Sequence, residues 1–129
     1  MFDDFDVIHR YTRAQAIQDG VLVDLGKGDL ANLSREAGIR FPVAMTAGAW
    51  AKTVGGLDDP LPAGQSIEGR VWDVLMVFRY AAKAQGGSRC DFEVRVWGGT
   101  RQEVVKLWAL CGPGDNAEPV ITIMLAGED

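Results

Sequence analysis

Residues that could bind an ion or a phosphate group gather near the end of the chain, in the stretch CGPGDNAEPVITIML, residues 111–125. Asp115, Asn116 and Glu118 offer side-chain oxygens there. A calcium site takes about six to eight oxygen ligands, so these three side chains are too few. A phosphate loop needs amides that converge at a helix N-terminus, and here a strand is predicted to follow. We therefore predict a hairpin turn, with contact to a partner as the alternative role of its polar side chains.

Nucleophiles and metal ligands are scarce elsewhere, since the chain has one histidine, His9, and two cysteines, Cys90 and Cys111. A structural zinc ion takes about four ligands, and Ser–His–Asp or Cys–His catalysis needs a histidine beside the nucleophile. We expect both cysteines to be small buried thiols. The sequence thus predicts no catalytic residue, no metal site and no cofactor.

The composition is that of one globular domain, which we expect to span residues 1–129. Apolar residues make up 47% of the chain and charged residues 24%, enough apolar side chains for a core. The formal net charge of −5 opposes nonspecific binding to nucleic acid, which requires a dense basic surface. Direct contact with nucleic acid is therefore not expected.

No segment predicts insertion into a membrane. The longest uncharged apolar run, residues 74–78, is far shorter than the roughly 20 residues of a membrane-spanning helix. The first residues, MFDDFDVIHRY, are acidic and lack the basic and apolar regions of a secretory leader. We therefore expect a cytoplasmic protein.

The N-terminal half predicts short elements separated by glycine and proline. Thr12 and Gln15 have the spacing of a capping box, which favours a helix that begins at Thr12 and stops at Gly20. Further along, we expect an extended segment at 21–25, a short helix at 29–37, an extended segment at 41–45 and a helix at 46–54.

Stronger patterns follow in the C-terminal half. Apolar residues recur every three or four positions in residues 66–83, as on the buried stripe of a helix. The period then changes to two in residues 90–97, 103–111 and 119–125, which predicts three strands. The GGTRQ stretch at 98–102 is typical of a hairpin turn.

These elements predict an α+β fold. We expect an antiparallel sheet with a C-terminal three-stranded meander, packed against the long central helix and shorter N-terminal helices. One face of the meander should be buried, through Phe92, Val94, Leu107, Ile121 and Ile123.

The opposite face of the meander carries Trp97 and Trp108, which flank the GGTRQ turn. We hypothesise that the two tryptophans lie close together across the hairpin. Either the N-terminal helices cover this face, or it is a partly open patch that receives a protein partner or forms a homodimer.

Four blocks in this order resemble a known family: YTRAQAIQDGVLVDL, AGIRFPVAMTAGAW, GRVWDVLMVFRYA and LCGPGDNAEPVITIMLAGED. The sequence resembles an uncharacterised bacterial domain of unknown function, often encoded on plasmids, integrative elements and phages, over residues 8–129. The resemblance implies a genetic context and assigns no catalytic residue. The polar CGPGDNAEP and GED stretches are the expected contact surfaces.

The leading hypothesis is a non-enzymatic, protein-binding accessory protein of a mobile genetic element. On the resemblance, its partner would be a host defence complex, inhibited as by an anti-CRISPR or anti-restriction protein. We assign its partner-binding residues as Asp115, Asn116, Glu118, Trp97 and Trp108.

Two other functions remain open. One is a small enzyme or ligand-binding domain that uses carboxylates, with Asp73, Asp115 and Glu118 as its candidates. The other is a maintenance or regulatory protein of a plasmid or phage. Its contact with DNA would need the basic residues of the long helix, where Glu68 and Asp73 interrupt Arg70, Arg79 and Lys83.

Overall fold

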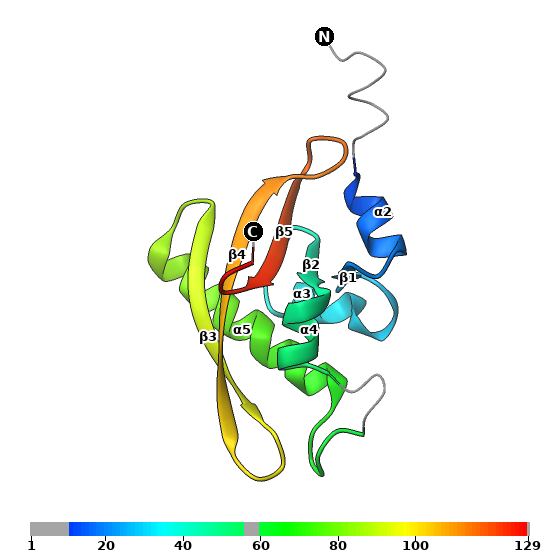
Figure 1. The fold of residues 1–129 in the computed structure, drawn as a ribbon. Helices are drawn as coiled ribbons and strands as arrows, with labels where there is room; N and C mark the ends of the chain where they lie inside the picture. The colour runs from blue at the N-terminus through cyan, green and yellow to red at the C-terminus, as the bar shows by residue number, and fades with distance from the viewer. Residues whose placement is uncertain (1–10, 56–59, 129) are drawn as a thin grey trace.

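The computed structural model describes residues 11–55 and 60–128 and has an α+β fold (Figure 1). Its N-terminal half contains α2 (Arg13–Gln18), β1 (Leu22–Asp24), the 3₁₀ helix η1 (Gly28–Leu30), α3 (Ala31–Glu36), β2 (Val43–Thr46) and α4 (Ala47–Thr53). Its C-terminal half contains α5 (Ile67–Gln85), β3 (Arg89–Trp97), β4 (Gln102–Pro113) and β5 (Pro119–Leu125). Within the described ranges, no helix has the length and apolar character needed to cross a bilayer.

The five strands form one mixed sheet in the order β1-β2-β5-β4-β3. The meander β3-β4-β5 is antiparallel, as predicted. β2 adds to the free edge of β5 in parallel, so the sheet is not antiparallel throughout. The parallel pair arises because α4, α5 and the meander intervene between the two strands and return the chain in the same direction.

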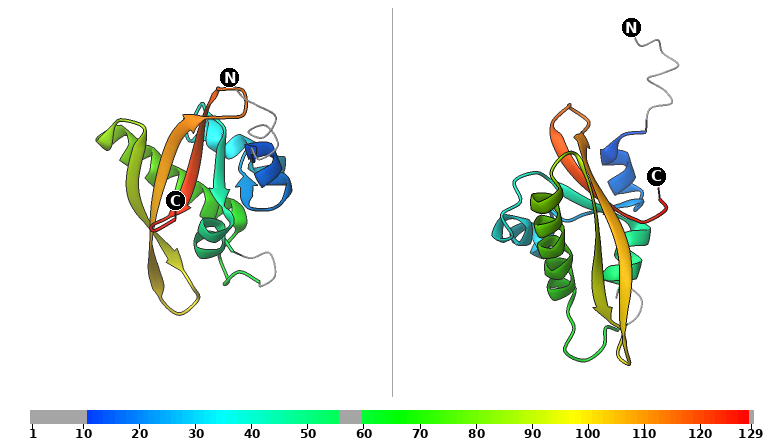
Figure 2. Two further views of the ribbon diagram at one scale, coloured as in Figure 1. Left: turned by 45° about the horizontal axis from the view of Figure 1, so that its top comes forward. Right: turned by 90° about the vertical axis from the view of Figure 1, so that its left-hand side faces the viewer.

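The long helix α5 covers one side of the sheet, which we call the inner face (Figure 2). The Ser66 side chain caps its first turn by accepting a hydrogen bond from Gly69 N at 3.0 Å. Val71, Val74, Leu75 and Phe78 form the predicted buried stripe. The helix begins where predicted and continues two residues beyond Lys83 before it stops at glycine.

The core lies between α5 and the inner face. Val94, Leu107, Ile121 and Ile123 are buried as predicted. Phe92 is half-buried and packs against Phe78 in a tilted arrangement, with ring centroids 5.9 Å apart. The period-two pattern therefore assigned the two faces of the meander correctly.

The opposite side of the sheet, the outer face, is covered unevenly. Helix α2 packs beside β1, on the side of the sheet away from α5 (Figure 2). Its capping box is present, because Thr12 and Gln15 exchange side-chain and backbone hydrogen bonds. Helix α2 lies beside the end of the sheet that contains β1. It does not cover β3, whose outer side chains are exposed.

Candidate functional site

The loop between β4 and β5 is a hairpin turn, as predicted, and its first acid holds a helix in place. The carboxylate of Asp115 accepts hydrogen bonds from Arg13 N at 2.8 Å and from Ala14 N at 3.0 Å. These amides lie in the first turn of α2, where backbone donors have no partner within the helix. Asp115 therefore docks α2 onto the hairpin.

Arg13 completes this junction from the helix side. Its guanidinium donates to Thr122 Oγ1 at 2.6 Å and to the Ile121 carbonyl at 2.8 Å. Burial lowers the pKa of Arg13 below its ordinary value, while the nearby carboxylates of Asp24 and Asp115 oppose that shift. Arg13 was not among the residues predicted for the site, because nothing in its local sequence shows that it meets β5.

The other two acceptors of the loop shape the turn itself. Gly114 N donates to the Glu118 carbonyl at 2.6 Å, and Ala117 adopts a positive φ of 65°. The Glu118 side chain folds back over the turn, so that a Cβ at Gly114 would overlap its carboxylate. Asn116 is exposed at the tip of the turn. Among the described residues, no group of three or more acids, histidines or cysteines lies close enough to hold a metal ion.

The hypothesis that Trp97 and Trp108 lie close together is wrong. Trp97 is paired with Gln102, directly across the turn, whereas Trp108 is paired with Asp91. Six positions along a strand correspond to about 20 Å. The tight GGTRQ turn sets this register and places the tryptophans at opposite ends of the hairpin.

Trp108 is buried in a contact with the end of the chain. Its indole Nε1 donates to the Glu128 carbonyl at 3.0 Å, and the Arg89 guanidinium lies 4.0 Å above the ring. The Glu128 carboxylate in turn accepts from Thr46 Oγ1 at 2.8 Å and from Leu125 N at 2.7 Å. The GED stretch, expected as a contact surface, therefore uses its glutamate to cover Trp108.

The two expectations for the second face of the meander are thus each met in part. Helix α2 and residues 126–128 lie over the outer face near β1, β5 and Trp108. Every side chain that β3 presents on this face is exposed. We call the exposed part, formed by Trp97, Glu93, Arg95, Val104 and Lys106, the hairpin face.

The hairpin face combines apolar and charged side chains. Trp97 is 37% exposed and Val104 52%, whereas Leu110, which is 39% exposed, lies apart from them beside α2. Glu93, Arg95 and Lys106 lie on the hairpin face as well, and within the described part of the chain none of the three forms an ion pair. Apolar side chains that gather on an otherwise uncovered face are typical of an interaction surface.

The outer edge of β3 is held by helix α5. The Gln85 side chain donates to Asp91 O at 2.6 Å and accepts from Asp91 N at 3.0 Å. The Arg70 guanidinium donates to the carbonyls of Trp97 and Val54. Because edge strands otherwise present unpaired backbone groups, these contacts keep β3 from pairing freely with other strands.

Comparison with known proteins identifies a family but assigns no activity. The model of a family of unknown function (DUF6573) matches residues 1–129. The chain belongs to this family. No curated protein and no solved structure matches it. Membership agrees with the resemblance to a domain of unknown function, and the geometry of the hairpin face remains the basis for assigning a role.

Proposed function

We propose that the protein is a non-enzymatic binding protein and that its hairpin face receives a protein partner. The observation that carries the proposal is the exposure of Trp97 and Val104 on a part of the sheet that the described helices leave uncovered. The two strands are paired along the whole hairpin, so the backbone that presents these side chains is already ordered before a partner binds. Of the predicted contact residues, Trp97 is retained here, whereas Trp108 lies further along the same side of the sheet and is covered by Glu128.

The charges of the hairpin face specify the chemistry of the partner. Arg95 and Lys106 contribute two positive charges and Glu93 one negative charge, in a chain whose formal net charge is −5. We therefore propose a partner surface with apolar side chains at its centre and acidic groups at its border. Complementary charges of this kind speed association and fix orientation.

A carboxylate enzyme is less well supported. The pKa of Asp73 is raised by loss of hydration, but this side chain lines a cavity of only about 10 Å³. Asp115 is committed to α2. Burial raises the pKa of the Cys90 thiol, which opposes formation of a nucleophilic thiolate.

A DNA-binding regulator is also less well supported. Arg70, the first basic residue in the series on α5, donates to two backbone carbonyls and to the Gln65 side chain. Its guanidinium is therefore occupied by internal contacts. Contact with phosphates needs basic side chains that face solvent.

The finer proposal is that the partner belongs to a host defence complex, which the protein inhibits. It rests on the resemblance described above and on the absence of an assigned activity, and the hairpin face supplies the surface that such an inhibitor needs. Expression of the chain in a host with an active CRISPR or restriction system should then reduce interference with an invading plasmid.

The test compares captured proteins between matched variants. Val104→Lys places a charge at the centre of the hairpin face, whereas Tyr80→Lys changes a residue that is 66% exposed on α5. The partner should copurify with the wild type and with Tyr80→Lys and should be lost with Val104→Lys. Loss from both variants, or from neither, would overturn the assignment. A dimer that only Val104→Lys dissociates would make the partner a second copy.

A further inference from the structure

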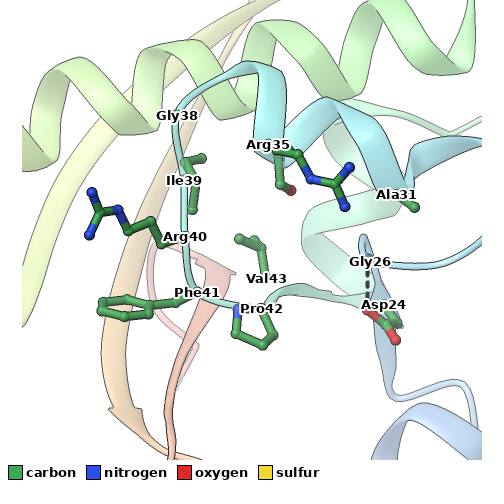
Figure 3. Close-up of a pocket in the computed structure, with 11 residues that line it drawn as sticks. Asp24, Gly26, Ala31, Arg35, Gly38, Ile39, Arg40, Phe41, Pro42 and Val43 are labelled. Carbon is green, nitrogen blue, oxygen red and sulfur yellow. Dashed lines mark hydrogen bonds between the residues drawn. The ribbon is translucent and has the colours of Figure 1, made fainter.

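A second surface feature is distant in sequence from the hairpin face. It is an open groove of about 730 Å³ between the end of β1, helix α3 and the segment 38–43 (Figure 3). Its walls are formed by Asp24, Gly26, Ala31, Ser34, Arg35, Gly38, Ile39, Arg40, Phe41, Pro42 and Val43. This volume lies in the range of sites for small organic ligands, roughly 300–1,000 Å³.

A buried hydroxyl lines the groove without a hydrogen-bond partner. Ser34 Oγ is shielded from solvent, and no described residue donates to it or accepts from it. Polar atoms in such positions are nearly always paired in folded proteins. Because this oxygen is closed to solvent, a ligand atom in the groove would supply the missing hydrogen bond once the Ser34 side chain rotates about χ1 toward the groove.

An arginine beside that hydroxyl is almost unengaged. Among the described residues, the Arg35 guanidinium makes one long hydrogen bond, to Asn32 Oδ1 at 3.5 Å, and no ion pair. Its side chain extends across the groove toward Ala31 in Figure 3. A guanidinium has five N–H donors in a planar fork that matches phosphate and carboxylate groups.

Two further arginines strengthen the positive potential at this end of the molecule. Arg40 lies on the segment that lines the groove, although its side chain points away from Arg35 (Figure 3). The Arg79 guanidinium packs against Gly38, with Nε 3.1 Å from the position that a Cβ would take. Neither Arg40 nor Arg79 forms an ion pair within residues 11–55 and 60–128.

The other side chains that line the groove indicate which further groups a ligand would carry. Asp24 lies across the groove from Arg35 (Figure 3). Its Oδ1 accepts from Gly26 N at 2.8 Å, and its Oδ2 lies 4.0 Å from the exposed Lys27 ammonium. Ile39, Pro42 and Val43 provide apolar surface between these ends.

The geometry points to a binding site for a small organic anion, a phosphate or a carboxylate with an apolar part and a hydrogen-bond donor. Arg35 and Ser34 bind the anionic group, Ile39, Pro42 and Val43 contact the apolar part, and Asp24 accepts from the donor. This site is independent of the hairpin face, and neither proposal requires the other.

The test is a titration of the full chain, labelled with ¹⁵N, followed by NMR at constant ionic strength. Adenosine monophosphate probes the phosphate form of the ligand, 4-hydroxyphenylacetate, whose hydroxyl is a donor, probes the carboxylate form, and adenosine is the neutral control. We expect saturable amide shifts within residues 24–43 with at least one anion and weaker or no shifts with adenosine. The anion that saturates at lower concentration identifies the source of the charge.

Variants make the assignment specific. Arg35→Gln and Ser34→Ala should each raise the dissociation constant of the saturating anion at least about fivefold. Arg101→Gln, which removes an exposed arginine of the β3–β4 turn, should leave it unchanged. The proposal is overturned if neither anion gives saturable shifts, if the shifts lie outside the groove, or if Arg35→Gln binds like the wild type.

Discussion

At the scale of single residues, the side chains most suggestive of chemistry in the sequence are mostly committed to internal contacts. Asp115 accepts from the first amides of α2, Glu118 folds over its own turn, and Glu128 covers Trp108. The contacts of Asp115 and Glu128 each join a loop or the last described residues to a distant element, whereas the contact of Glu118 is local. Polar loop residues in this protein therefore stabilise the fold first, and Asn116 is the member of the predicted loop set that is exposed at the tip of the turn.

Asp115→Ala should lower the free energy of unfolding by about 1–2 kcal/mol, as loss of a helix cap does. The reason is that two amides of α2 lose a carboxylate acceptor. Chemical denaturation measures the change. The neighbouring Asn116→Ala, at an exposed position of the same turn, is the control and should stay within about 0.5 kcal/mol of the wild type. Equal stability of the two variants would show that Asp115 does not anchor α2.

Substitution by lysine should affect stability differently at the two candidate tryptophans. Trp108→Lys should lower the free energy of unfolding by about 3–5 kcal/mol, because it buries a charge where an aromatic ring is 9% exposed. Trp97→Lys, at a position 37% exposed, should cost much less and leave a folded protein. Thermal and urea unfolding compare them. A stable, folded Trp108→Lys variant would remove the structural role assigned to Trp108.

At the scale of elements, sequence periodicity predicted the helix and the strands whose positions depend on local burial of side chains. Helix α5 and the strands β3, β4 and β5 lie where the apolar periods place them. Strand β3 has one buried and one exposed side, whereas β5 is buried on both of its faces. The parallel pairing of β2 with β5 was not predicted, since it depends on how elements pack across the whole chain. The same limit applies to the bonds between Asp115 and α2, which join residues 102 and 101 positions apart.

The raised pKa of Asp73 on helix α5 predicts that stability depends on pH. Lost hydration raises its pKa, so the folded state binds this proton more tightly than the unfolded state does. Its ionisation therefore reduces stability as pH rises from the ordinary aspartate pKa through the raised one. Asp73→Asn should be more stable than the wild type near pH 7, and the difference should disappear near pH 3. Urea unfolding at both pH values decides this, and a difference independent of pH would contradict the assignment.

At the scale of the whole molecule, the sheet divides the protein into a packed side and a partly open side. Helix α5 and the core occupy the inner face, while α2 and residues 126–128 lie over part of the outer face. The hairpin face stays open, and Gln85 and Arg70 protect its edge from pairing. This arrangement presents apolar side chains on a paired hairpin while it restrains the edge strand, which is consistent with the proposed binding role.

The most direct test of this account is the affinity of the purified partner for matched variants. Val104→Lys should weaken binding at least about tenfold, equivalent to about 1.4 kcal/mol, with the variant folded as judged by circular dichroism. Tyr80→Lys, on helix α5, should bind within about twofold of the wild type. Calorimetric titration measures both. Unchanged affinity of a folded Val104→Lys variant would contradict the assignment of the hairpin face as the binding surface.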